Sequence, residues 1–386
     1  MSTHWIRGMG LGLLTLSVVP GAEGNAAAAE SWVYFGTYTG GKSRGIHVSR
    51  FNHETGVLGQ AALVAEMTNP SFLAVHPNGR QLYAVGETAD STGRRGGTVA
   101  AFQLDAATGG LKPLSTQDSH GSHPCHLTVD RTGRWVLVAN YSSGTLSVFP
   151  VAEDGSLGSA KQVIQHSGSS VNTSRQMAPH AHSIQLDPRN RHAIAADLGI
   201  DKLMVYDFDA KTGQLEPNQP PFASLAPGSG PRHFAFHPDG RHLFAINEML
   251  TTITAFSYDG RQGRLKELST VPTLPGPNPG DASTAEILVH PTGRFVYGSN
   301  RGHHSIVVYR FDRKTSALTL VEHESTGGKT PRNFVIDPTG RWLLAENQDS
   351  DSVVVFAIDA DTGALTPTGQ RIEVGSPVCA RFVAVR

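Results

Sequence analysis

Five residues of this chain could together hold an anion and activate water: Arg232, Arg301, Arg332, Glu248 and His182. A guanidinium group offers a rigid, two-pronged set of donors that fits a carboxylate or a phosphate. Glutamate and histidine can take a proton from water once neighbouring groups tune their pKa values. An arginine beside a developing oxyanion would stabilise it. These residue types suggest an anion-binding site that can activate water.

The elements that must position these residues are the strands of an internal repeat. Six segments align without gaps on the pattern Pro-x-x-apolar-x-apolar-[His/Asp]-Pro-x-Gly-Arg, and one such segment recurs roughly every fifty residues. Their His or Asp anchors are His76, Asp130, Asp187, His237, His290 and Asp337. Each segment is typical of a strand, a turn and a second strand, because apolar runs such as FLAVH and QLYAV flank the Pro-x-Gly-Arg turn. A third strand and a second turn follow.

The two ends of the chain complement each other. The chain ends on PVCARFVAVR, which reads as an innermost strand without a second strand, whereas WVYFGTYTG near the start reads as a second strand without a first. Pairing them completes a seventh blade and closes a ring. The sequence therefore predicts an all-β fold, a seven-bladed β-propeller of four-stranded blades, formed by residues 30–386 as a single domain. A solenoid is the alternative, but solenoids need capping repeats.

Comparison of the repeats with one another separates structural positions from functional ones. The position ten residues after the anchor is nearly uniform, with Asn140, Asn247 and Asn300 among its members, and is typical of strand-end caps. The next position, and the positions five and four residues before the anchor, are polar and differ between repeats. They lie where the two innermost strands end, and these ends converge on one mouth of the central channel, the usual place for a ligand. The candidates taken from these positions are Arg232, Arg301, Arg332, Glu248, His182, His126, His233, Glu286, Asn333 and Gln348. The alternative is a set of arginine–glutamate pairs that only neutralise each other.

Two further features concern the segment around residue 180. Residues 166–178 are rich in Ser and Gly and lead to His180, so they predict either a loop over the channel mouth or a passive linker between blades. His180 and His182 alternate along a strand as metal ligands can, but no cysteine or carboxylate stands near them in sequence. We therefore expect no metal and no other cofactor.

Charge and the N-terminal segment limit the function classes. Lys plus Arg number 32 and Asp plus Glu number 33, giving a net charge of −1, so no global charge recruits nucleic acid. The apolar run Met9–Val19 is too short to span a bilayer and is followed by an A-x-A cleavage pattern at Ala26–Ala29. Residues 1–29 therefore predict a signal peptide, and we expect a periplasmic or secreted monomer with no membrane span after cleavage.

The two cysteines are expected to stay reduced. Cys125 and Cys379 fall at the starts of corresponding strands in repeats that are not neighbours. A disulfide requires Cα atoms within about 7 Å of each other. The positions therefore favour two buried free thiols.

Several runs resemble the lactonase family of seven-bladed propellers, which includes propeller-type 6-phosphogluconolactonase and is similar to carboxy-muconate cyclase. They are FGTYTGGKSRGI, PHAHS, PGSGPRHFAFHP and SNRGHHSI, within a resemblance that covers residues 32–386. The resemblance implies hydrolysis or formation of a lactone ring in the central cleft without a required metal. The family's motif-borne His, Arg, Glu and Arg match His182 (or His180), Arg232, Glu248 and Arg301. These four are the predicted catalytic residues; the predicted substrate-binding residues are His180, His126, His233, Glu286, Arg332, Asn333 and Gln348.

The resulting expectation is a carboxylic-ester hydrolase that opens a small anionic sugar-acid lactone. Glu248 or His182 would deprotonate the attacking water, while Arg232 and Arg301 hold the carbonyl oxygen and the acidic substituent. A carboxy-muconate cyclase-type enzyme, a non-enzymatic exported ligand-binding propeller and a metal-dependent sugar lactonase are the alternatives. Phosphogluconolactone is made in the cytosol, so an exported enzyme would rarely meet it, and the identity of the lactone stays open.

Overall fold

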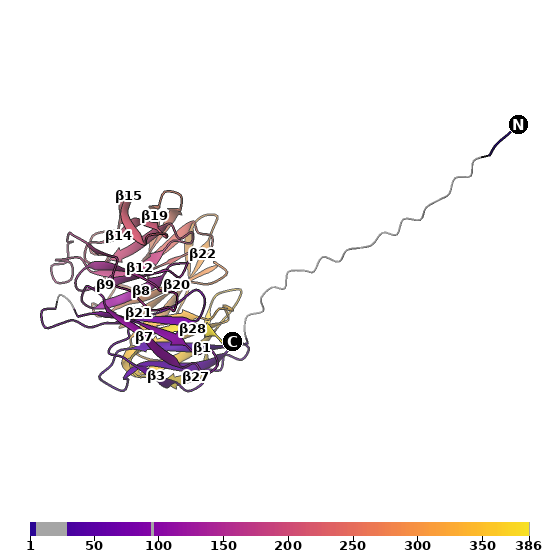
Figure 1. Ribbon diagram of the computed structural model, residues 1–386. Helices are drawn as coiled ribbons and strands as arrows, with labels where there is room; N and C mark the ends of the chain where they lie inside the picture. Colours follow the sequence, from indigo (N-terminus) through magenta and orange to yellow (C-terminus); the bar gives the residue numbers. More distant parts are fainter. Residues whose placement is uncertain (5–28, 94–95, 386) are drawn as a thin grey trace.

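The computed structural model describes residues 1–4, 29–93 and 96–385, and within them the chain forms seven four-stranded antiparallel sheets. The segment 5–28 lies outside the described residues, and with it most of the predicted signal peptide. No helix in the described part of the chain is long and apolar enough to cross a membrane. The prediction of a seven-bladed all-β propeller is confirmed (Figure 1).

The four strands of each blade follow one another from the channel outward. Blade 1 contains β28 (Pro377–Ala384), β1 (Glu30–Thr37), β2 (Gly45–Asn52) and β3 (Ala62–Glu66); blade 2 contains β4 (Leu73–Val75), β5 (Gln81–Gly86), β6 (Thr98–Leu104) and β7 (Leu111–Asp118). Blade 3 contains β8 (Pro124–Val129), β9 (Trp135–Asn140), β10 (Thr145–Pro150) and β11 (Gln162–Gln165); blade 4 contains β12 (Ala181–Leu186), β13 (His192–Asp197), β14 (Lys202–Asp209) and β15 (Gln214–Ser224). Blade 5 contains β16 (Pro231–Phe236), β17 (His242–Asn247), β18 (Thr252–Asp259) and β19 (Arg264–Pro272); blade 6 contains β20 (Ser283–Val289), β21 (Phe295–Arg301), β22 (Ser305–Asp312) and β23 (Ala317–Ser325). Blade 7 contains β24 (Pro331–Ile336), β25 (Trp342–Asn347), β26 (Ser352–Ile358) and β27 (Leu365–Glu373), with a single 3₁₀ turn, η1 (Gln348–Ser350), after β25.

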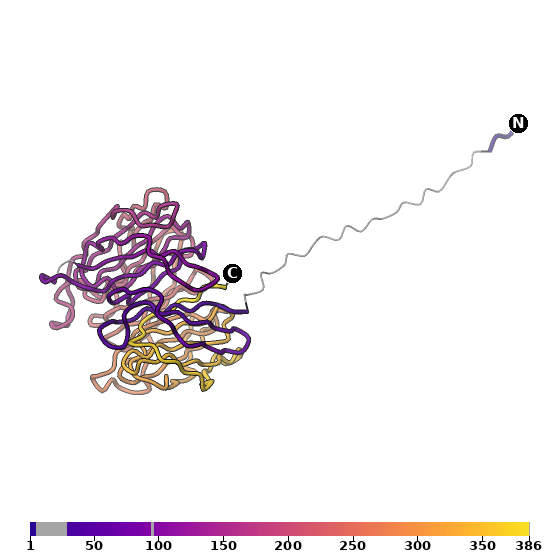
Figure 2. The backbone as a smooth tube through the Cα atoms, turned by 60° about the horizontal axis from the view of Figure 1, so that its bottom comes forward, coloured from indigo at the N-terminus to yellow at the C-terminus, as the bar shows by residue number. Residues whose placement is uncertain are grey.

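The ring closes as the two ends of the sequence predict. β28 pairs antiparallel with β1, from Ser31 opposite Ala384 to Thr37 opposite Pro377. Figure 2 shows the yellow C-terminal strand beside the indigo first strand. The innermost and second strands of blade 1 thus come from opposite ends of the chain.

The burial of the second strand of each blade shows that the core lies between the blades. In β5, β9 and β13 every residue is buried, whereas the outer strand β19 is mostly exposed. A strand that is covered on both faces reads as a continuous apolar run rather than an alternating one. In the contact between blades 6 and 7, for example, Tyr297 packs in one cluster with Phe334 and Phe356.

The repeated His anchor ties each turn to the next blade. His76 Nε2 donates to the Gly133 carbonyl at 2.9 Å, and His290 Nε2 donates to the Gly340 carbonyl at 2.8 Å. The partner must be glycine for two reasons: Gly133 has φ +74°, and a Cβ there would lie 2.2 Å from His76 Nε2. Asp anchors instead accept backbone N–H groups of their own turn, as Asp130 does.

Both cysteines are buried free thiols, as the repeat predicts. These are Cys125 in β8 and Cys379 in β28. They belong to blades 3 and 1, which blade 2 separates.

Candidate active site

In four blades, a β-bulge near the start of the innermost strand re-aims one side chain. In β8, β12, β16 and β24 the register with the second strand skips one residue. The skipped residues are Cys125, His182, Arg232 and Arg332, which are the residues five positions before each anchor. A bulge commonly re-aims a side chain beside an active site. The repeat predicts the positions, and the bulge explains their orientation.

Three of the four bulged residues meet the ends of the second strands in a cavity of about 260 Å³, whereas the fourth, Arg232, contacts Glu248 without lining the cavity. Cys125, His182 and Arg332 come from the bulges, and Glu248 and Arg301 from the ends of β17 and β21. The remaining lining residues are Glu87, Tyr141 and Arg175. The structure therefore brings most of the predicted catalytic set to one place.

Glu248 is the centre of the charge arrangement. Its Oε1 accepts a bond of 2.8 Å from Arg175 Nη2, and its Oε2 lies 2.9 Å from Arg301 Nη2 and 3.3 Å from Arg232 Nε. Burial alone would raise the pKa of this carboxyl, but Arg301, Arg232 and Arg175 outweigh burial and hold the pKa at about 2. Glu248 is therefore ionised, and a carboxylate with so low a pKa is a weak base.

The arginines exceed the carboxylates in number. Arg232 is buried and donates through Nη1 to the Ala285 carbonyl at 2.6 Å; burial, with Arg332 and Arg301 nearby, lowers its pKa to about 10, so it stays charged at neutral pH. Arg332 has no carboxylate within 4.0 Å among the described residues, and its guanidinium lies 5.2 Å from the Tyr38 ring. Arg175, Arg232, Arg301 and Arg332 set against Glu87 and Glu248 leave two formal positive charges uncompensated.

His182 is a neutral group within this positive surround. Burial first, and then Arg232 and His233, lower its pKa well below the ordinary 6.5. Its Nδ1 lies 3.6 Å from Cys125 Sγ, and its ring meets that of Tyr141 edge-on at 5.2 Å. At neutral pH the imidazole therefore has one ring nitrogen free of a proton. His180 lies at the rim, where its ring stacks on Tyr141 at 4.7 Å and its Nδ1 donates to the Tyr141 carbonyl at 3.1 Å.

Four predicted substrate-binding residues lie one layer deeper than the mouth. His233 Nδ1 lies 2.9 Å from Glu286 Oε1, and Asn333 Nδ2 donates to Glu286 Oε2. The His126 ring packs 4.1 Å from Phe72 and 5.3 Å from His233. These groups bond mainly to one another, so they form a floor beneath the arginines.

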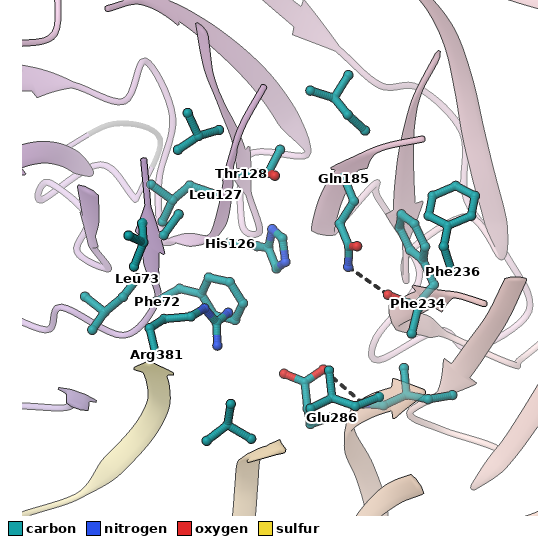
Figure 3. A pocket seen from close by; sticks show the side chains of 18 of the residues that line it. Phe72, Leu73, His126, Leu127, Thr128, Gln185, Phe234, Phe236, Glu286 and Arg381 are labelled. Carbon is teal, nitrogen blue, oxygen red and sulfur yellow. Dashed lines mark hydrogen bonds between the residues drawn. The ribbon is translucent and has the colours of Figure 1, made fainter. Parts of the chain in front are cut away.

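That floor also faces a second cavity of about 650 Å³, which Figure 3 shows with His126, Glu286 and Arg381 directed into it. Its other walls come from the later halves of the innermost strands, such as Val75 and Val129, so it lies toward the opposite end of the channel. Gln348 lines neither cavity: it sits on η1, and its Nε2 donates to Asp349 Oδ1 at 3.0 Å.

Sequence reasoning missed Arg175 and passed over Tyr38 and Glu87. Arg175 belongs to the 166–178 segment, and it donates to Tyr141 Oη at 3.0 Å as well as to Glu248. The next residue, Gln176, anchors the segment by donating to Asp201 at 2.8 Å. The segment is therefore a loop that contributes to the site, not a passive linker. Glu87 occupies the same repeat position as Glu248 and accepts a bond of 2.8 Å from Tyr38 Oη.

One run in the chain has the spacing of a phosphate-binding P-loop without its structure. Residues 36–43 read GTYTGGKS, which fits G-x-x-x-x-G-K-[ST]. The run joins β1 to β2 and no helix follows it. Lys42 there pairs with Glu373 at 2.5 Å, at the outer edge of blade 7. The match is incidental, because a P-loop needs the start of a helix.

Comparison with known proteins identifies the family of this chain. Residues 32–382 match the family described as lactonase, 7-bladed beta-propeller. The chain belongs to the lactonase family of seven-bladed β-propellers. One lactonase relative, from Bacillus subtilis (strain 168), is named 6-phosphogluconolactonase and is 39% identical over 301 residues, which is 78% of this chain and 83% of the relative. Another of that name, from Formosa agariphila, is 35% identical over 306 residues, or 78% of this chain and 85% of the relative.

The solved structures include a close match in shape. The periplasmic gluconolactonase of Pseudomonas aeruginosa superposes with a TM-score of 0.87 at 35% sequence identity, covering 92% of this chain and 100% of that one. The family resemblance inferred from the motifs is thus confirmed over almost the whole propeller.

Proposed function

We propose that the protein is a lactonase that hydrolyses the lactone of an anionic sugar acid at the arginine-lined cavity. The observation that carries this is the pair of uncompensated positive charges around a cavity that also holds a neutral histidine. The names of the relatives support lactone hydrolysis, one as 6-phosphogluconolactonase and one as periplasmic gluconolactonase. A phosphate or carboxylate on the substrate would neutralise the surplus charge.

Arg332 is the group best placed to bind that anionic substituent. Its charge has no carboxylate partner within 4.0 Å in the described part of the chain, so binding an anion breaks no ion pair there.

Arg301 is the group best placed for the lactone carbonyl. Its Nη2 already donates to Glu248 and to the Thr284 carbonyl, while its buried Nε has no partner among the described residues. Because Arg301 lines the cavity, its guanidinium is the proposed partner of the oxyanion that forms when water adds to the carbonyl.

His182 is the proposed base, and Glu248 is the proposed partner of the arginines. A water oxygen adds to the lactone carbonyl carbon, its proton passes to His182, and the carbonyl oxygen becomes the oxyanion. The bond from this carbon to the ring oxygen then breaks, and the ring oxygen takes the proton back from His182 and leaves as a hydroxyl. Glu248 is held by three guanidinium groups with its pKa at about 2, so it is poorly suited to accept the proton.

The test is hydrolysis of glucono-1,5-lactone and of its 6-phosphate, with and without chelator, above the spontaneous rate. An Arg232→Ala variant removes a guanidinium from the site, and Lys211→Ala, on an exposed turn, serves as the control. Chelator-resistant turnover that Arg232→Ala loses and Lys211→Ala keeps would support the proposal. No excess over the spontaneous rate on either lactone would contradict it and favour a lactonising enzyme or a binding propeller.

We further propose that residues 1–29 direct export and that the mature protein works in the periplasm. The periplasmic gluconolactonase of similar structure supports this location. Cell fractionation followed by N-terminal sequencing should find mature protein that begins at Glu30, and gel filtration should find a monomer. Full-length protein in the cytosol would contradict the proposal.

A further inference from the structure

A second cluster of chemically capable side chains lies at the opposite end of blade 5. The turn between β16 and β17 places Asp239 Oδ1 2.9 Å from His237 Nδ1, and Asp239 Oδ2 3.0 Å from His242 Nδ1. Ligand atoms of all three residues lie within 4.8 Å of one another, and no other group of this kind occurs in the described part of the chain. The three side chains are 6%, 10% and 12% exposed, in chain order.

Hydrogen bonds to the far nitrogen orient each imidazole. His237 Nε2 lies 2.9 Å from the Gly293 carbonyl, which can only accept, so Nε2 carries a proton. Its Nδ1 accepts the Asp239 N–H at 3.1 Å, as the His76 and His290 rings do in their own turns, so an ion bound at Nδ1 would take the place of this bond. His242 Nε2 lies 3.2 Å from Ser316 Oγ, which can donate or accept, so this bond holds the ring whichever of its nitrogens carries the proton. Metal-binding histidines are typically held in this way, by a bond from the other ring nitrogen.

The side-chain contact between His237 and Asp239 differs in kind from the contact in the turn of blade 6. In blade 6 the place of Asp239 is taken by Thr292, whose hydroxyl lies 2.7 Å from His290 Nδ1 and can donate to it. An ionised carboxylate has no proton to give. His237 Nδ1 thus lies 2.9 Å from Asp239 Oδ1, a contact between a ring nitrogen and a carboxylate that the turn of blade 6 lacks. A cation at this place could be coordinated by both atoms.

Blade 2 shows that the cluster is not required by the repeat. Its turn reads HPNGRQ from His76 to Gln81, whereas the turn of blade 5 reads HPDGRH from His237 to His242. In blade 2 the Asn78 side chain accepts the Arg80 N–H at 2.8 Å, which closes the turn without a carboxylate. The two residues that differ, at the third and sixth positions, are the two that complete the ligand set in blade 5.

We propose that His237, Asp239 and His242 form a binding site for a first-row transition-metal ion, for which Zn²⁺ is the best fit. Two imidazole nitrogens and one carboxylate oxygen match the ligands that Zn²⁺ takes in proteins, with the fourth position left to water or a small anion. Arg241 and Arg313 line the surface hollow beside Asp239 and His242, so they favour an anion there.

The site is separate from the arginine-lined cavity. Arg232 and His237 lie at opposite ends of β16, roughly 17 Å apart at about 3.3 Å per residue. The bound ion would join the start of β17 to the anchor that ties blade 5 to blade 6. Because the ion binds the folded chain, it should raise the melting temperature.

The experiment uses untagged, chelator-treated protein titrated with Zn²⁺ by calorimetry, with Co²⁺ absorption as a second probe of the ligands. The double variant Asp239→Asn with His242→Gln gives blade 5 the native hexapeptide of blade 2. The reverse variant, Asn78→Asp with Gln81→His, gives blade 2 the native hexapeptide of blade 5. Both use turns that this chain already folds, which makes them matched controls for each other.

We expect one equivalent of Zn²⁺ in the wild type, none at this site in the first variant and two equivalents in the reverse variant. Zn²⁺ should raise the melting temperature of the wild type and leave that of the first variant unchanged. The proposal is overturned if the wild type binds no stoichiometric Zn²⁺, which would indicate a protonated histidine instead, or if the first variant keeps the equivalent. Lactone hydrolysis should be the same in the wild type and the first variant, so the two proposals can fail independently.

Discussion

Replacing His182 by glutamine tests which group takes the proton from water. The change removes the ring nitrogen that is free of a proton at neutral pH and leaves the four arginines in place. Loss of a general base typically lowers the rate by about 10²–10⁴-fold. At 1.36 kcal/mol per tenfold, this corresponds to about 2.7–5.4 kcal/mol in the barrier. We expect the loss in kcat, with KM nearly unchanged, because the arginines still hold the anion.

Replacing Glu248 by glutamine should give a different signature. The drop in its pKa from the ordinary 4.5 to about 2 corresponds to about 3 kcal/mol of stabilisation of the carboxylate by its guanidinium partners. An amide can accept from one or two of those groups but presents its NH₂ to another. We expect a lower melting temperature, a looser Arg175 and a higher KM, with a smaller loss of kcat than His182→Gln shows.

The assay is the initial rate of acid release from the lactone, corrected for spontaneous opening, between pH 5 and pH 8. A protonated imidazole cannot accept a proton, so kcat/KM falls as the pH drops through the pKa of His182. Since that pKa lies well below 6.5, the wild-type profile should stay flat from neutral pH to below 6.5. Circular dichroism melting of each variant shows that it is folded. A Glu248→Gln enzyme that loses more kcat than His182→Gln, at unchanged KM, would refute this assignment.

Four further predictions follow from particular contacts. Arg332→Ala should raise KM for the phosphorylated lactone more than for the unphosphorylated one, and an equal rise for both would show that Arg332 does not hold the anion. Arg175→Ala should increase hydrogen exchange in residues 166–178, because its bonds to Glu248 and Tyr141 are lost, while exchange in β9 stays the same. Gly293→Ala should lower the free energy of unfolding by about 2 kcal/mol or more, because φ is +74° and the new Cβ would lie 2.5 Å from His237 Nε2. The control is Gly276→Ala, which has open space around the new Cβ and should change the free energy of unfolding little. The pKa of Glu248 is lower in the folded protein than in the unfolded chain, so its contribution to stability is present above about pH 4.5 and is lost as the pH falls toward 2. Denaturant titrations at pH 7 and pH 3 should therefore show a drop in the free energy of unfolding of the wild type that the Glu248→Gln variant lacks.

The blades and the closure of the ring could be predicted from the sequence because both follow from short local patterns of residues. Each Pro-x-Gly-Arg turn marks one pair of inner strands. The run at the end of the chain reads as an innermost strand without a second strand, and the run at its start reads as a second strand without a first. β28 and β1 pair as those runs predict. The candidate residues could be found in the same way, since the chain supplies its own alignment and Glu248, Arg301 and Arg332 stand out against the other repeats.

The depth of each side chain could not be read from the repeat. Adjacent residues in a regular strand point to opposite faces, so the pattern alone does not say how Arg232 and His233 can both face the channel. The bulge between Pro231 and His233 provides the answer and separates them into two layers. The role of Arg175 could not be predicted from the sequence for another reason. It lies in a connection between blades that is longer than the equivalent connections, so the residues there have no matched positions in the other repeats.

The two layers together suggest how substrate binding and proton transfer are linked. The surplus positive charge lies in the mouth around His182, and Arg232 and Arg332 help to lower the pKa of that imidazole. A bound anion would cancel part of this charge, so the pKa of His182 should rise when the site is occupied and the imidazole should become a stronger base. The anionic substituent would then contribute to kcat as well as to KM, because it tunes the base and does not only hold the substrate. A lactone without that substituent should be slower even at saturation, and addition of free phosphate should restore part of the lost kcat. If the two lactones have the same kcat, the arginines act in binding alone.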